Sequence, residues 1–166
     1  MAITVKRVGY GQVEPNHLSA QKTGQIYAQL PTKTGIDLLE NGQFVKYNYS
    51  DSVVDFEGAG EWMMVFNEVK IYDERKSYKD FAMIRGNYTA GSMVPRVIKI
   101  NIGDIFTTNC IGAADASTEL ELKDKVAPGA DGYLVKNEGA TEYVFEVVKT
   151  YTMADGQPAV KLMRIA

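Results

Sequence analysis

The chain has few of the residues that most metal and nucleophilic chemistry requires. Its 166 residues include one cysteine, Cys110, and one histidine, His17. A structural zinc site takes four cysteine, histidine or acidic ligands, so we predict no zinc site. Cys110 has no second cysteine with which to form a disulfide within the chain. No G-x-S-x-G motif accompanies His17, and the sequence therefore predicts no nucleophilic catalysis.

Long hydrophobic runs and a large excess of one charge are also missing. The apolar block at residues 62–66 is far shorter than the roughly 20 residues of a membrane-spanning helix. Residues 1–11 lack the continuous apolar stretch of a secretory signal, so we expect a protein made and kept in a reducing cytoplasm. The 18 basic and 21 acidic residues give a net charge of −3. This balance predicts neither a nucleic-acid partner nor a membrane partner.

What the chain does contain is typical of β-structure. Ten tyrosines and six phenylalanines occur with valine, isoleucine and threonine in short runs separated by glycine-containing turns. No window sustains the apolar spacing of a helix for three turns, and only residues 14–22 could form a short one. We predict an all-β fold, an antiparallel barrel or sandwich with an extended N-terminal arm and little helix. The expected strands are 26–30, 44–49, 61–72, 81–84, 97–102, 105–111, 119–122, 132–136, 142–152 and 159–165.

Three of these strands allow more specific predictions. Residues 62–66 are apolar at every position, which predicts a strand covered on both faces, and residues 67–72 then alternate. Residues 142–152 followed by Asp155-Gly156 predict a C-terminal hairpin. Gly103-Asp104 predicts a second hairpin with a type II′ turn, in which glycine occupies the first central position.

The domain organisation follows from a change in composition near residue 35. Residues 1–35 contain few large apolar side chains, so we expect an extended arm, with a single β domain over residues 36–166. The arm could lie on its own domain or on a neighbouring subunit. Residues 41–46 resemble residues 131–136, which suggests two similar hairpin-rich halves, 39–111 and 119–166. Ordinary β-hairpins of average composition would explain the same likeness.

Acidic residues provide candidates for two other kinds of site. Asp51, Asp55 and Glu57 lie close enough in sequence to supply oxygen ligands to calcium, although a solvated loop explains them equally simply. A hydrolase with two carboxylates could use Asp37 with Glu40, or Glu119 with Glu121. Neither pair has a distinctive sequence context. We therefore predict no catalytic, cofactor or metal-binding residues.

An aromatic surface for stacking sugars is a further alternative. Trp62 and the ten tyrosines could form such a surface in a carbohydrate-binding β module. The position of Trp62 in a strand that is apolar on both faces predicts a core residue instead.

Several motifs, taken together, resemble the virion structural proteins of tailed bacteriophages, in particular the auxiliary proteins that decorate the outside of the head. The likeness extends over residues 39–165. It is carried by Leu-Glu-Asn-Gly at 39–42, Gly-Glu-Trp at 60–62 leading to Tyr-Asp-Glu at 72–74, Gly-Asp-Ile-Phe-Thr-Thr-Asn at 103–109, Pro-Gly-Ala-Asp-Gly-Tyr-Leu-Val at 128–135 and Asp-Gly-Gln-Pro-Ala-Val-Lys at 155–161.

This resemblance implies a non-enzymatic protein on the exterior of the virion, assembled in the host cytoplasm. Its partners would be the major capsid protein and copies of itself, with a trimer as the favoured oligomer. A head fibre, collar or tail protein is the alternative within the same class. For subunit or lattice contacts we predict Lys6, Arg7 and Tyr10 in the arm, and Met93 and Arg96 before residue 97.

Overall fold

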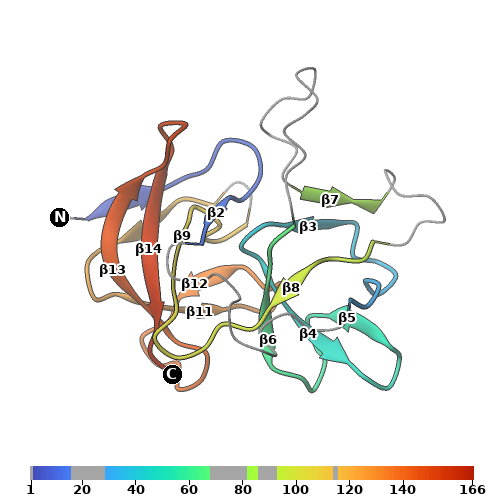
Figure 1. Ribbon diagram of the computed structural model, residues 1–166. Helices are drawn as coiled ribbons and strands as arrows, with labels where there is room; N and C mark the ends of the chain where they lie inside the picture. Colours follow the sequence, from blue (N-terminus) through green and yellow to red (C-terminus); the bar gives the residue numbers. More distant parts are fainter. Residues whose placement is uncertain (1, 16–28, 68–81, 86–92, 114–115) are drawn as a thin grey trace.

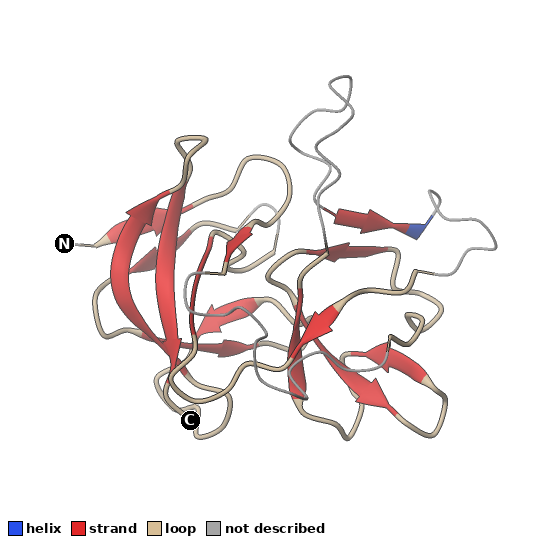
Figure 2. Ribbon diagram, in the orientation of Figure 1, coloured by secondary structure: helices blue, strands red, loops and turns tan. Residues whose placement is uncertain are grey.

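The computed structural model describes residues 2–15, 29–67, 82–85, 93–113 and 116–166 (Figure 1). These residues form antiparallel β-sheets and contain no α-helix, which confirms the all-β prediction (Figure 2). The strands are β1 (Ile3–Val5), β2 (Val13–Glu14), β3 (Leu38–Glu40), β4 (Phe44–Asn48), β5 (Val53–Asp55), β6 (Trp62–Val65), β7 (Ala82–Ile84), β8 (Val97–Ile98), β9 (Ile105–Thr108), β10 (Thr118–Leu120), β11 (Lys125–Pro128), β12 (Leu134–Lys136), β13 (Phe145–Thr152) and β14 (Pro158–Arg164).

A four-stranded sheet in the order β5-β4-β6-β8 lies between two hydrophobic cores. Successive residues of a strand point to opposite faces. Phe44 and Met64 accordingly pack in the first core, whereas Val45 and Met63 pack in the second. The predicted coverage of both faces at residues 62–66 is thus confirmed for β6, while the expected continuation over residues 68–72 lies outside the described residues.

A six-stranded sheet in the order β12-β11-β13-β14-β9-β2 closes the first core from the other side. Its centre is the predicted hairpin of β13 and β14, which pair from Phe145 opposite Arg164 to Thr152 opposite Pro158. The rings of Phe106 and Phe145 lie 5.5 Å apart between centroids, and Phe44 of the four-stranded sheet is 5.3 Å from Phe145. These three rings join the two sheets.

Two ribbons complete the layers. β3 pairs with β7 and covers the second core with Leu39 and Met83. β1 pairs with β10 and contributes Val5 and Leu120 to the first core. No sheet of the described residues closes into a barrel, so the layers resemble a sandwich.

The described part of the expected arm lies on its own domain, which is the first of the two placements considered. β1 and β2 pair with β10 and β9 of the same chain. Residues 31–33 run beside β5, where the Val54 N–H donates to the Pro31 carbonyl at 2.8 Å. Glu14, at the start of the expected short helix, belongs to β2, and residues 16–22 lie outside the described residues.

The hairpin predicted at Gly103-Asp104 is wrong. Gly103 has a φ of +90° but occupies the third position of the turn, after Asn101 and Ile102. The strands on either side do not pair with each other, because β8 pairs with β6 and β9 pairs with β14 and β2.

The two proposed similar halves differ in strand pairing. β4, in the first half, pairs with both β5 and β6, whereas β12, in the second half, pairs with β11. The first core also draws on both halves, with Phe44 and Met64 beside Phe106 and Phe145.

Candidate functional site

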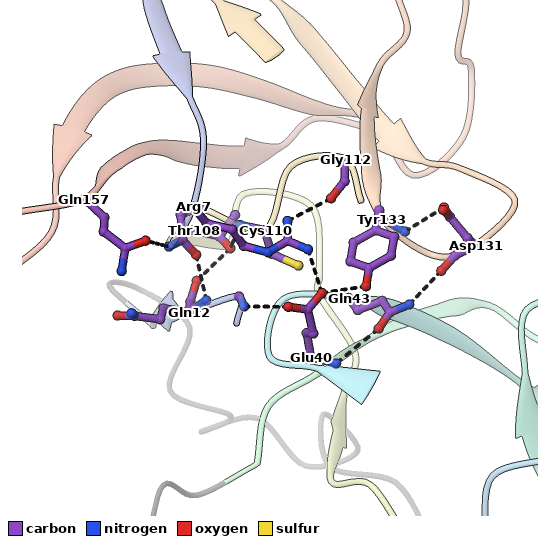
Figure 3. A network of polar contacts seen from close by, with 12 residues as sticks. Arg7, Gln12, Glu40, Gln43, Thr108, Cys110, Gly112, Asp131, Tyr133 and Gln157 are labelled. Atoms are coloured by element: carbon purple, nitrogen blue, oxygen red, sulfur yellow. Dashed lines mark hydrogen bonds and ion pairs between the residues drawn. The ribbon is translucent and has the colours of Figure 1, made fainter. Parts of the chain in front are cut away.

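A buried ion pair holds the N-terminal segment against the rest of the molecule (Figure 3). The Arg7 Nη2 group donates to Glu40 Oε2 at 2.7 Å, and both side chains are buried. The same carboxylate accepts the Tyr133 hydroxyl at 2.5 Å and the Gly11 N–H at 2.9 Å. Arg7 Nη1 donates to the Gly112 carbonyl at 2.9 Å. Opposite charges and four hydrogen bonds thus offset part of the cost of burying the pair, while the buried Arg7 Nε has no hydrogen-bond partner among the described residues.

The groups around this pair are held in their neutral forms. Burial, and then the hydrogen bond to Glu40, raises the pKa of Tyr133. Burial also raises the pKa of the Cys110 thiol, with the Glu40 charge as a second cause. Both groups therefore stay protonated at neutral pH, and the cluster joins segments rather than supplying a nucleophile.

The predicted contact residues divide into two groups. Lys6 is exposed, and Tyr10 and Arg96 are half-buried. Arg7 and Met93 are buried within the chain, so their assignment as surface contacts is corrected. Arg7 is drawn inward by Glu40, and Met93 fills the second core.

The acidic loop around Asp55 binds its own backbone. The buried Asp55 carboxylate accepts the N–H groups of Glu57 at 3.0 Å and Gly58 at 2.5 Å. Asn48 Nδ2 donates to its other oxygen at 3.1 Å. Within the described ranges, no three His, Cys, Asp or Glu side chains form a group that could hold a metal ion. His17 lies outside those ranges.

The two carboxylate pairs considered for hydrolysis are not arranged around a common reaction centre. Glu40 is buried against Arg7, whereas Asp37 is exposed and 3.1 Å from Arg85 Nε. Glu119 and Glu121 are both exposed on the surface.

Among the described aromatic residues, one ring is largely exposed, and no flat aromatic surface is formed. Trp62 is half-buried against the first core, and the Lys46 ammonium lies 4.5 Å from its ring centroid. The largely exposed ring belongs to Tyr49, with 68% of its surface accessible. Its inner neighbour is the buried Tyr47, at 5.5 Å between centroids.

Within the described part of the chain, three turns share one hydrogen-bonding arrangement, although their sequences differ. They span residues 40–43, 101–104 and 121–124, and each immediately precedes a strand: β4, β9 or β11. In each turn, the N–H of the fourth residue donates to the carbonyl of the first, and the side chain of the fourth accepts the N–H of the first. The third residue has a positive φ, as in a type II turn.

The same turns are fastened to a neighbouring strand by two further backbone bonds. The third residue donates its N–H to Val65, Arg164 or Val147, at 2.9 Å in each case. That neighbour donates its own N–H to the carbonyl of the fourth residue. We call this arrangement the capped turn. Two hydrogen bonds fix its internal shape, and two fix its position relative to the sheet.

The three capped turns differ in the exposure of their second residue. Asn41 is buried, and its side chain accepts the Asn67 N–H at 2.8 Å. Ile102 and Leu122 instead point into solvent, with 69% and 53% of their surface exposed.

The sequence on both sides of the third capped turn is acidic. Residues 117–146, all of them described, contain seven acidic and three basic residues, a difference of −4. Lys136 Nζ lies 2.7 Å from Asp124 Oδ2, and this contact lowers the pKa of Asp124. Glu138 and Glu121, after Asp124, further raise the pKa of Lys136, so these carboxylates gather around one lysine.

Comparison with known proteins adds no family assignment. No family model, no curated protein and no solved structure matches this chain. Among the described segments, none is a helix long and apolar enough to cross a membrane.

Proposed function

We propose that this protein is a non-enzymatic structural protein of a tailed-phage virion, bound to the outside of the head as a decoration or cement protein. The observation that carries the proposal is the layered β body. Its central sheet is covered on both faces, and its N-terminal segment is fastened by a buried ion pair. The likeness of residues 39–165 to decoration proteins gives the proposal its particular class.

A stiff body suits binding to a symmetric shell for a physical reason. Each copy makes a limited contact, and the contact must be geometrically fixed because the lattice repeats it. Groups that are already ordered lose less conformational entropy on binding. Hydrogen bonds and buried side chains hold the described residues in place before a partner binds.

The proposed partners are the major capsid protein and copies of this chain, with a trimer favoured. We place the protein on the virion exterior, after assembly in the host cytoplasm, with no direct contact to nucleic acid or membrane. Lys6, Tyr10 and Arg96 remain candidate contacts because their side chains are at least partly accessible.

Co-sedimentation tests this proposal directly. Purified full-length protein is mixed with heads assembled from the capsid protein of the same particle but lacking this chain. We expect saturable co-sedimentation at a fixed number of copies per head. If the protein stays in the supernatant at micromolar concentrations, the decoration role is rejected. Imaging that places the chain on a fibre, collar or tail would move it to that part of the virion.

A carbohydrate-binding module is the second candidate, and the exposed ring of Tyr49 is the observation that favours it. An exposed aromatic ring with polar neighbours can stack on a sugar. A glycan array measures this property. A hit that disappears in Tyr49→Ala but persists in Tyr10→Ala would support the module, whereas an array without hits would reject it.

A further inference from the structure

The third capped turn contains a strained residue where its two counterparts contain glycine. Gly42 and Gly103 occupy the third position at φ of +91° and +90°, and Lys123 occupies it at +72°. A side chain in this left-handed region is sterically disfavoured, and glycine adopts it freely. The hydrogen bonds of the turn use only the backbone of this residue. Nothing in the turn itself therefore requires a lysine.

Two other non-glycine residues, Ser52 and Tyr143, have positive φ among the described residues. Tyr143 has a structural explanation, because its ring lies over the Arg164 guanidinium at 4.2 Å. Ser52 belongs to a turn that has no counterpart in the described chain. Lys123 differs from both residues because two other turns of the same kind have glycine at the equivalent position. Strain that persists at one position is a sign of a functional constraint there.

The residues near Lys123 in sequence supply one exposed apolar side chain and several exposed acidic ones. Leu122 is the exposed apolar residue next to Lys123, and the turn holds it in a fixed position. Glu121 directly precedes Leu122, Glu138 accepts the N–H of Lys125 just after the turn, and Glu119 lies two residues before it; all three acidic side chains are exposed. A protein surface complementary to this one has a recess for an apolar side chain, basic residues opposite the glutamates and an acidic group opposite Lys123.

We propose that the turn at residues 121–124 is the surface by which this protein binds the shell of the head, with Leu122 as the apolar anchor and Lys123 as a contact retained at the expense of backbone strain. The inference rests on the proposed function and names its contact site. Its occupant is a capsid-protein surface with an apolar recess, lysine or arginine opposite the glutamates, and a carboxylate opposite Lys123. The counterpart turn at residues 101–104 carries an exposed Ile102 without strain and serves as the internal comparison.

The test compares matched variants of the two turns in the head-binding assay. We expect Leu122→Ser to weaken binding at least tenfold, because buried apolar anchors dominate interface energetics. Ile102→Ser, of equal chemistry in the equivalent position, is expected to change binding less than twofold. Both variants should keep the wild-type Tm to within about 2 °C, because each side chain is largely exposed.

Lys123→Gly separates stability from binding. Relief of strain is expected to raise Tm by about 2 °C, while loss of the contact weakens binding by about threefold or more. The inference is overturned if Leu122→Ser and Ile102→Ser bind alike, if Lys123→Gly binds heads as well as wild type does, or if it fails to raise Tm. Absence of wild-type binding would reject the decoration role itself. Wild-type binding that these variants leave unchanged would reject only the contact site.

Discussion

The four-stranded sheet and the six-stranded sheet bury their residues in different patterns. In β6 both neighbours Met63 and Met64 are buried, because a core lies on each face of the strand. In β14, Leu162 is buried and Met163 is half-exposed, because the core lies on one face. Two adjacent apolar residues are thus both buried in the four-stranded sheet, whereas in this part of the six-stranded sheet only one of the two is buried. A run of consecutive apolar residues predicts the layer in the middle, and alternation predicts a layer at the outside.

Removing the charge of Arg7 is expected to have the largest effect, because its ion pair joins the N-terminal segment to the turn that precedes the four-stranded sheet. Arg7→Leu leaves the buried Glu40 carboxylate without its cation, and we expect a loss of about 3–5 kcal/mol in the free energy of unfolding. Urea denaturation measures it. Lys6→Leu, at the adjacent exposed position, should change stability by less than about 0.5 kcal/mol. Equal effects at the two positions would show that the pair does not hold the segment.

Alanine substitutions at adjacent positions test the contrast between the two sheets. We expect Met63→Ala and Met64→Ala each to cost about 2–5 kcal/mol, since each removes a buried side chain from one of the two cores. Leu162→Ala should fall in the same range, whereas Met163→Ala should cost less than about 1 kcal/mol. Denaturant midpoints of the four variants give the comparison. A tolerated substitution at either Met63 or Met64 would contradict the coverage of both faces.

A smaller, pH-dependent effect is expected at the edge of the six-stranded sheet. Lys136 and the Glu121 N–H lower the pKa of Asp124. Its contribution to stability is therefore complete above the unfolded value of about 3.9 and is lost as pH falls through the lower folded value. Asp124→Asn keeps an oxygen for the turn but removes the charge. Calorimetry should find wild type more stable than the variant at pH 7, with the difference disappearing near pH 2. A difference that is the same at both pH values would exclude the carboxylate charge as its cause.

The fold was predictable where a signal lies within one strand or one turn. The apolar run at residues 62–66 and the Asp155-Gly156 turn gave correct placements for β6 and for the β13–β14 hairpin. The strands β1, β2, β3, β5 and β11 were missed. The first two lie in a segment with few large apolar side chains, and the other three are runs of three or four residues too short to show a strand period. The hairpin at Gly103-Asp104 was wrongly predicted for another reason. A glycine signals a positive φ but does not say which position of the turn it occupies.

The candidate site was predictable to a smaller extent. Arg7 and Glu40 are separated by 33 residues, and no spacing rule connects them. The local sequence signal is that Glu40 directly follows two leucines, a context in which a buried acid needs a partner. The three capped turns share hydrogen bonds rather than residues, and Lys123 conceals the third copy because glycine is absent there. The similarity of the three turns is visible only in their backbone geometry and hydrogen bonds.

The most direct test of the account is a cryo-electron microscopy map of heads incubated with the purified chain, compared with heads alone. The account predicts added density of the size of this chain at symmetry-related positions on the outer surface, with residues 121–124 against the shell. A map without added density, or one in which this turn faces solvent while another surface meets the shell, would contradict it.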